Sequence, residues 1–244
     1  MEPNNEWLKR NLGLEYHADE DNIWLQKGIT LRRLIGILGI MLPVFLWFFL
    51  WVSTNRVEEL ESISHYYYTR VDSIFIITIS LLAIFLIIYK GPALVDFYLS
   101  LVAGICALLV VLFPTSPLSD HIPDVNMSFF NTVLSDNPTR IMVHYYSAGI
   151  FILLLATMLL FLFTKSDKPK ATRGTMKIMR NRLYRVCGIG MIAAVLVMGL
   201  RGFGWIDAEF YDARNLTFWM EVVAVELFGI SWLIKGETLL KDKT

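Results

Sequence analysis

Two short stretches that pair histidine with tyrosine stand just ahead of long apolar runs: HYYYTR at 65–70 and HYYS at 144–147. The chain has four histidines, so half of them occupy such positions. An imidazole can ligate a metal ion or exchange a proton near neutral pH. If both apolar runs enter a membrane from the same side, His65 and His144 lie near the same face. The two stretches therefore predict a shared polar site.

The distribution of apolar residues predicts the elements that must hold this site. Hydrophobic residues make up 55% of the 244 residues, the mean hydropathy is +0.53, and the apolar residues gather in blocks. A membrane-spanning helix needs about 20 mostly apolar residues. The sequence thus predicts an all-α transmembrane bundle of six spans, at about 34–52, 72–89, 96–113, 143–163, 186–204 and 217–234. The second and third runs are short, so we expect Tyr66 to Tyr68 to form an interfacial first turn of the second helix.

The positions of lysine and arginine predict the orientation of the bundle. With the N-terminus in the cytoplasm, 17 of the 22 basic residues face the cytoplasm. Five remain outside, namely Arg56, Arg70, Arg140, Arg201 and Arg214. We therefore expect both termini to be cytoplasmic. Acidic and basic residues balance at 22 each, which predicts no nucleic-acid partner.

Three regions follow from this pattern. Residues 1–33 form a cytoplasmic amphipathic segment without the apolar run of a cleavable signal peptide. Residues 34–235 form the transmembrane domain, with an outer loop at 114–140 and a basic inner loop at 164–185. Residues 236–244 form a cytoplasmic tail. The basic inner loop favours contact with anionic lipid headgroups. Cys106 and Cys187 fall in or beside apolar runs and predict two free thiols.

Other ionisable residues are expected near the two histidines at the outer face. Arg70 and Asp72 follow His65 closely. Arg201 lies near the outer end of the fifth span, and Glu221 lies four or five residues into the sixth span, at a similar depth. A lone charge is costly at that depth, so we expect an ion pair between Arg201 and Glu221. Glu226 lies deeper, about 13 Å below the start of its helix at 1.5 Å per residue. The ligand-binding residues predicted for this site are Arg70, Arg201, Glu226, Tyr66 and Tyr145.

Three uses of such a site remain open, beside a plain scaffold or interaction protein. The first is a zinc-dependent hydrolase with His65 and His144 as metal ligands, a third ligand from Asp72, Glu221 or His121, and Glu221 or Asp72 as the catalytic base. The second is an ion or proton path along His144, Glu221 and Glu226. The third, ranked below zinc, is a haem held by the two histidines. The sequence leaves open whether the protein is an enzyme and whether it forms a homo-oligomer.

Several stretches resemble a family of uncharacterised bacterial six-helix membrane proteins. They are SISHYYYTR at 62–70, LVAGICALLVVLFPTSP at 101–117, HYYSAGIFILLL at 144–155, RNRLYRVCGI at 180–189 and FWMEVVAVELFGISWLIKGE at 218–237. The resemblance implies an inner-membrane location and no particular activity. A short stretch is also similar to the alkaline-ceramidase and progestin/adipoQ-receptor superfamily, whose members have seven helices and a site of three histidines, an aspartate and a serine. This chain departs from that pattern in its six spans and in Ala148, where a second late histidine would stand.

Overall fold

The computed structural model describes residues 28–55, 59–117, 130–132, 134–165 and 174–240, and the segment predicted at 1–33 falls mostly outside them. Two short helices, η2 and α7, lie in connections, and η3 continues α5 as a π-helical turn. The helices are α2 (Gly28–Thr54), η2 (Ile63–Tyr68), α3 (Asp72–Ile88), α4 (Leu94–Leu112), α5 (Pro138–Thr157), η3 (Met158–Leu162), α6 (Thr175–Gly202), α7 (Ala208–Asp212) and α8 (Leu216–Lys235).

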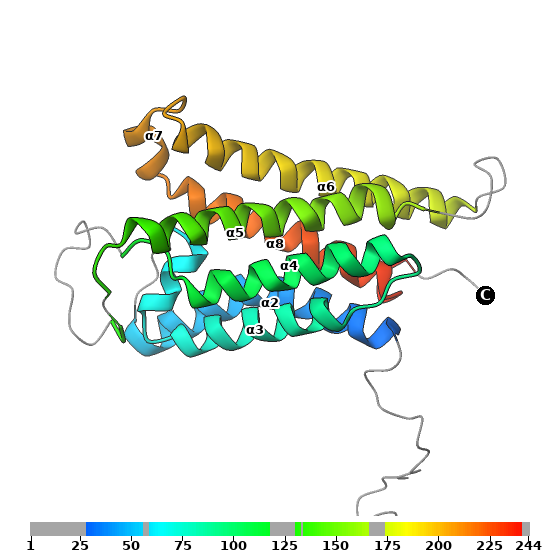
Figure 1. Ribbon diagram of the computed structural model, residues 1–244, viewed down its shortest axis with the longest axis horizontal. Coiled ribbons are helices and arrows are strands. Elements are labelled where there is room, and N and C mark those ends of the chain that lie inside the picture. The colour runs from blue at the N-terminus through cyan, green and yellow to red at the C-terminus, as the bar shows by residue number, and fades with distance from the viewer. Residues whose placement is uncertain (1–27, 56–58, 118–129, 133, 166–173, 241–244) are drawn as a thin grey trace, which may run out of the picture.

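The six long helices run side by side (Figure 1), and their contacts make them a closed ring of neighbours. Each of α2 to α5 packs on the next long helix in the chain, and α8 closes the ring by packing on both α6 and α2. Among the described residues, five helices are long and apolar enough to cross a membrane, and α3 is an apolar helix of 17 residues. The protein is therefore an all-α, multipass integral membrane protein.

Two helices begin earlier than the predicted spans. Helix α5 begins at Pro138, five residues before the predicted start, because the Asn137 side chain accepts a hydrogen bond from the Arg140 backbone at 3.0 Å. Helix α6 begins at Thr175, so the later part of the predicted inner loop is helical. The expected interfacial turn at Tyr66 to Tyr68 is wrong, because these residues form a separate 3-10 helix in which Tyr66 and Tyr68 are buried.

Two apolar cores fill the ring, one toward each end. The core at the end predicted to be cytoplasmic surrounds Trp232, whose ring lies 5.0 Å from that of Tyr89 and 5.2 Å from that of Phe163. The other core surrounds Tyr66 and Phe75. Cys106 and Cys187 are buried free thiols. Each end of the bundle therefore has its own apolar core, and the polar groups at that end pack against it.

Candidate functional site: the outer polar cluster

The segment that contains His65 lies across one end of the helix bundle. This cap segment, residues 59–69, includes η2, whose N-terminus is capped by Ser62. It is joined to the start of α8, because the Phe218 backbone donates to the Glu61 carbonyl at 3.1 Å and the Asn215 side chain donates to the Glu59 carbonyl at 3.4 Å. These two bonds give carbonyls of the cap segment hydrogen-bond partners within the protein, as buried backbone groups require.

His144 supplies hydrogen bonds to the end of α4. Its Nδ1 donates to the carbonyls of Phe113, at 2.9 Å, and Val110, at 3.2 Å. Val110 would normally accept from the amide four residues later, but that residue is Pro114, which has no N–H. With the proton on Nδ1, His144 Nε2 accepts from the Ser64 hydroxyl at 3.1 Å. His144 therefore replaces the missing amide and ties the cap segment to α4 and α5.

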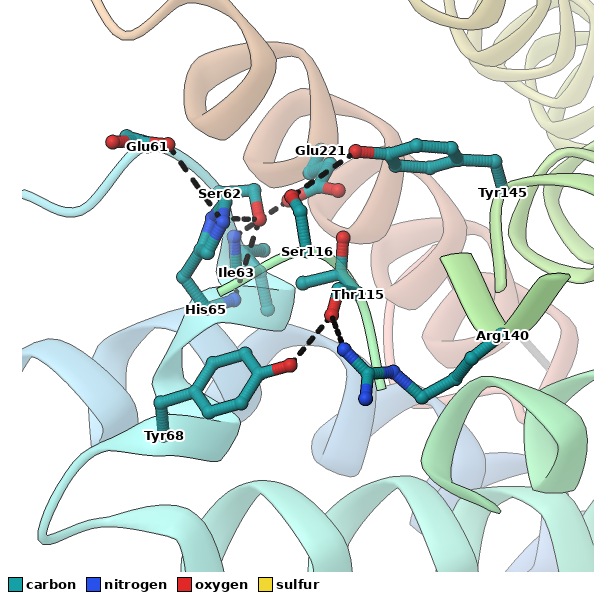
Figure 2. Close-up of polar contacts among 10 residues, drawn as sticks. All are labelled: Glu61, Ser62, Ile63, His65, Tyr68, Thr115, Ser116, Arg140, Tyr145 and Glu221. Atoms are coloured by element: carbon teal, nitrogen blue, oxygen red, sulfur yellow. Dashed lines mark hydrogen bonds and ion pairs between the residues drawn. The ribbon is translucent and has the colours of Figure 1, made fainter. Parts of the chain in front are cut away.

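Arg140, one turn before His144, donates to the carbonyls of Pro114 and Thr115, and Figure 2 shows the contact with Thr115. Its Nε donates to the Pro114 carbonyl at 3.1 Å and its guanidinium reaches the Thr115 carbonyl at 3.5 Å. The Tyr68 hydroxyl donates to the same Thr115 oxygen at 2.5 Å. The side chains of α5 and of the cap segment thus bind the chain that leaves α4.

His65 forms a local chain of polar contacts with Glu61 and Ser62. Its Nδ1 lies 2.8 Å from Ser62 Oγ, and its Nε2 lies 3.7 Å from Glu61 Oε2 (Figure 2). Nε2 is buried and has no hydrogen-bond partner among the described residues. A proton on Nε2 faces the carboxylate and leaves Nδ1 to accept from Ser62, which is the order of acid, base and hydroxyl used in nucleophilic catalysis. Ser62 Oγ also accepts from the His65 backbone at 3.3 Å as the cap of η2.

Burial lowers the pKa of His65 to about 4, with Glu61 opposing the shift and His144 adding to it. The unfolded imidazole has a pKa near 6.5, so between about pH 6.5 and 4 the unfolded chain binds more protons. The contribution of His65 to the free energy of unfolding is therefore fully present above pH 6.5. It decreases as the pH falls, by at most about 1.4 kcal/mol per pH unit. We expect denaturation curves at pH 7.5, 6.5 and 5.5 to show this loss, and His65→Gln to reduce it. An unchanged slope in the variant would contradict the assignment to His65.

Glu221 also contacts the cap segment. Its Oε2 accepts a hydrogen bond from the backbone N–H of Ile63 at 2.6 Å (Figure 2). The predicted ion pair between Arg201 and Glu221 is wrong. Arg201 instead pairs with Asp212 at 2.7 Å, because α7 brings that carboxylate back to the end of α6. The Ile63 amide is therefore the only hydrogen-bond donor to Glu221 among the described residues.

The polar side chains described above form the outer polar cluster, which consists of Glu61, Ser62, Ser64, His65, Arg140, His144 and Glu221. The other predicted site residues are not part of it. Asp72 begins α3, where its carboxylate accepts from Ser73 and from the Asn131 side chain. Tyr145 is exposed and lies 3.4 Å, hydroxyl to hydroxyl, from Ser116. Tyr66 is fully buried, and its hydroxyl has no hydrogen-bond partner among the described residues.

The last two predicted ligand-binding residues, Arg70 and Glu226, lie in different parts of the fold. Arg70 is exposed, at the turn before α3. Glu226 is partly buried in α8, five residues beyond Glu221, and forms no hydrogen bond or ion pair with another described residue. At 1.5 Å per residue it lies about 7.5 Å further along the helix. Among the described residues, Glu226 is not one of those that bind the cap segment.

The donor set of this cluster does not resemble a metal centre. Within the described ranges, no group of three or more His, Cys, Asp or Glu residues could hold a metal ion. Both ring nitrogens of His144 are already hydrogen-bonded. Coordination of zinc or haem iron through either nitrogen of His144 would have to break the hydrogen bonds at that nitrogen. His121, the remaining histidine considered as a third ligand, lies outside the described residues.

The roles of Ser64 and Pro114 were missed from the sequence. A proline just after an apolar helix signals a carbonyl without its usual amide, and His144 is the donor that replaces this amide at Val110. The partner of His144 could not be found in this way, because Ser64 is 80 residues distant along the chain.

The chain was also compared with known proteins. No family model, curated protein or solved structure matches it. The resemblances described above therefore stay predictions, and the function has to be argued from the residues themselves.

Proposed function

We propose that this integral membrane protein binds a small ligand at the outer polar cluster, and that Glu221 is the group that engages it. The observation that supports this proposal is the contact between Glu221 and Ile63. An ionised carboxylate has about four lone-pair sites, and a partly buried one is poorly satisfied by a single donor. A ligand with an amine or several hydroxyl groups supplies the missing donors.

The surroundings of Glu221 suit such a ligand. The ring of Tyr66 lies 6.4 Å from that of Phe218, one turn before Glu221, and offers an apolar wall with a hydroxyl that lacks a partner among the described residues. The Ile63 amide belongs to the cap segment, so a ligand that takes its place at Glu221 also loosens that segment. Access from the extracytoplasmic side, as predicted from the basic residues, needs this movement.

Hydrolysis of the bound ligand is the chemical option that this site adds. Ser62 and His65 would supply the nucleophile and the base, with Glu61 orienting the imidazole, so the reaction needs no metal. This arrangement replaces Glu221 and Asp72 as the candidate catalytic residues.

The proposal is tested with the full chain in detergent, using ethanolamine and putrescine as donor-bearing probes and tetramethylammonium as a cation without N–H groups. We expect the two amines to raise the melting temperature, because a ligand at 100 times its Kd stabilises by about 2.7 kcal/mol. Glu221→Gln is expected to abolish the shift. Glu226→Gln, on the same helix but away from the cap segment, is the matched control and keeps it. Equal shifts from all three cations, or a shift that survives in Glu221→Gln, would refute the proposal.

Proton movement is a second candidate, favoured by one specific observation. Glu226 is an intramembrane acid with no partner among the described residues, and such acids commonly serve proton relays. The same two variants separate the candidates. If the protein conducts protons in liposomes and Glu226→Gln stops the flux, transport is the function, and amine binding at Glu221 is secondary.

A further inference from the structure

The outward surface of the bundle carries residues that mark both membrane–water interfaces. Among the described residues, all the exposed tryptophans lie at the end of the bundle that holds the outer polar cluster, namely Trp47, Trp51, Trp205 and Trp219. Tryptophan favours the headgroup level of a bilayer. Exposed basic side chains lie toward the other end, namely Arg33, Lys90, Arg182 and Arg185. The distance between such markers along a helix therefore measures the apolar thickness that the protein presents to lipid.

Helix α6 has a short apolar run between two charges. Arg185 is exposed, and Arg201 is held at the far end of the helix by its ion pair with Asp212 at 2.7 Å. The two arginines are 16 residues apart, which is about 24 Å along an α-helix. The hydrocarbon core of a typical bilayer is about 30 Å thick. In such a bilayer, Arg185 reaches the headgroups only by extending its side chain toward them.

Helices α2 and α3, which lie across the ring from α6, are also short in this sense. Helix α3 has 17 residues, about 26 Å, and the exposed Lys90 follows its end. On α2, the exposed side chains of Arg33 and Trp51 are 18 residues apart, about 27 Å. Because any tilt from the membrane normal shortens these spans further, both sides of the bundle present less than the usual thickness.

Helix α5 provides an internal comparison. The exposed Tyr145 and Lys165 are 20 residues apart, about 30 Å along this helix and its π-helical turn. The six long helices run in nearly the same direction in Figure 1, so these lengths compare directly. The short spans therefore belong to α6 on one side of the ring and to α2 and α3 on the other, and not to the whole perimeter.

We propose that this protein fits a bilayer with a hydrocarbon core of about 25 Å, so that its preferred lipid partners have short acyl chains. Such a bilayer places Lys90 and Arg185 at one interface and the exposed tryptophans at the other. A thicker bilayer has to be deformed around α3 and α6, and that deformation has an energetic cost. The inference concerns the surface toward lipid, so it stands whether or not the outer polar cluster binds an amine.

The test uses the full chain in nanodiscs of phosphatidylcholines that differ only in acyl length, with monounsaturated chains of about 14, 16, 18, 20 and 22 carbons. Stability is followed by the melting temperature. We expect the highest melting temperature with chains of about 14 or 16 carbons and a fall of several degrees by about 20 carbons. A maximum at 18 or more carbons, or a melting temperature that does not depend on chain length, overturns the proposal.

Two variants of α6 test whether the spacing of its charges sets this match. Arg185 and Arg182 are both exposed and lie three residues apart on one side of the helix. Arg185→Leu extends the apolar run by three residues, about 4.5 Å, whereas the matched control Arg182→Leu leaves the run unchanged.

We expect Arg185→Leu to move the best chain length upward by about two carbons and Arg182→Leu to leave it where it is in the wild type. Melting temperatures in detergent, which imposes no bilayer thickness, show that both variants are folded. A best chain length that is the same in Arg185→Leu as in the wild type, or that moves equally in both variants, also overturns the proposal.

Discussion

His144→Ala is expected to destabilise the protein by about 3–5 kcal/mol, one of the two largest single effects predicted. The substitution leaves the carbonyls of Phe113 and Val110 without a donor and removes the acceptor of the Ser64 hydroxyl. Each unsatisfied buried polar group costs about 1–3 kcal/mol. At about 2–4 °C per kcal/mol for a chain of this size, the melting temperature in detergent should fall by about 10 °C.

The neighbouring tyrosine and the proline supply the controls. Tyr145→Phe removes only an exposed hydroxyl and should change stability by less than about 0.5 kcal/mol. Pro114→Ala restores an amide that can reach the Val110 carbonyl. In that background, His144→Ala should therefore cost about 1 kcal/mol less than it does in the wild type. If the two costs are equal, His144 does not replace the missing amide.

Gly229→Ala is expected to separate α2 from α8 and is the other large effect. A Cβ at position 229 would lie 2.8 Å from the Gly36 carbonyl oxygen and 2.6 Å from the Ile40 side chain. One of these contacts is with backbone, so a rotamer change cannot relieve it. Overpacking of this kind costs about 1–3 kcal/mol, and Gly229→Val should cost more. We expect an SDS titration to show a loss of stability that is larger in Gly229→Val than in Gly229→Ala.

A glycine in an open position provides the comparison. A Cβ added at Gly149 in α5 meets nothing within 4 Å. Gly149→Ala should therefore be neutral or stabilising by up to about 1 kcal/mol, because alanine favours a helix over glycine. Equal losses at positions 149 and 229 would show that the effect is not one of close helix packing.

These two sites show how far the sequence predicts the outer polar cluster. His65, His144 and Glu221 were expected to lie near one face, and all three contact or belong to the cap segment. Their partners were not expected. Glu221 was assigned to Arg201, but it accepts from a backbone amide, and a backbone group carries no signal in the residue types.

A cavity at the other end of the bundle, lined by Arg32, Lys177, Arg180, Tyr184, Ile234, Lys235 and Glu237, shows the same limit. Lys177 and Arg180 belong to a basic stretch that was read as a topology signal and a lipid contact. Arg32 and Lys235 come from the first and last long helices of the described chain, about 200 residues apart. Only closure of the helix ring, through the contact of α8 with α2, gathers these charges around one cavity.

The sequence by itself determined that this protein is an all-α membrane protein, because a long apolar run in lipid must satisfy its backbone within a helix. It also determined which ionisable residues stand near helix ends. The tertiary structure decided which of those groups meet, because hydrogen bonds across a bundle depend on helix neighbours and rotation. Helix neighbours and helix rotation are set by the close approach of Gly36 and Gly229 and by the position of the cap segment. Hydropathy predicts neither of these two features.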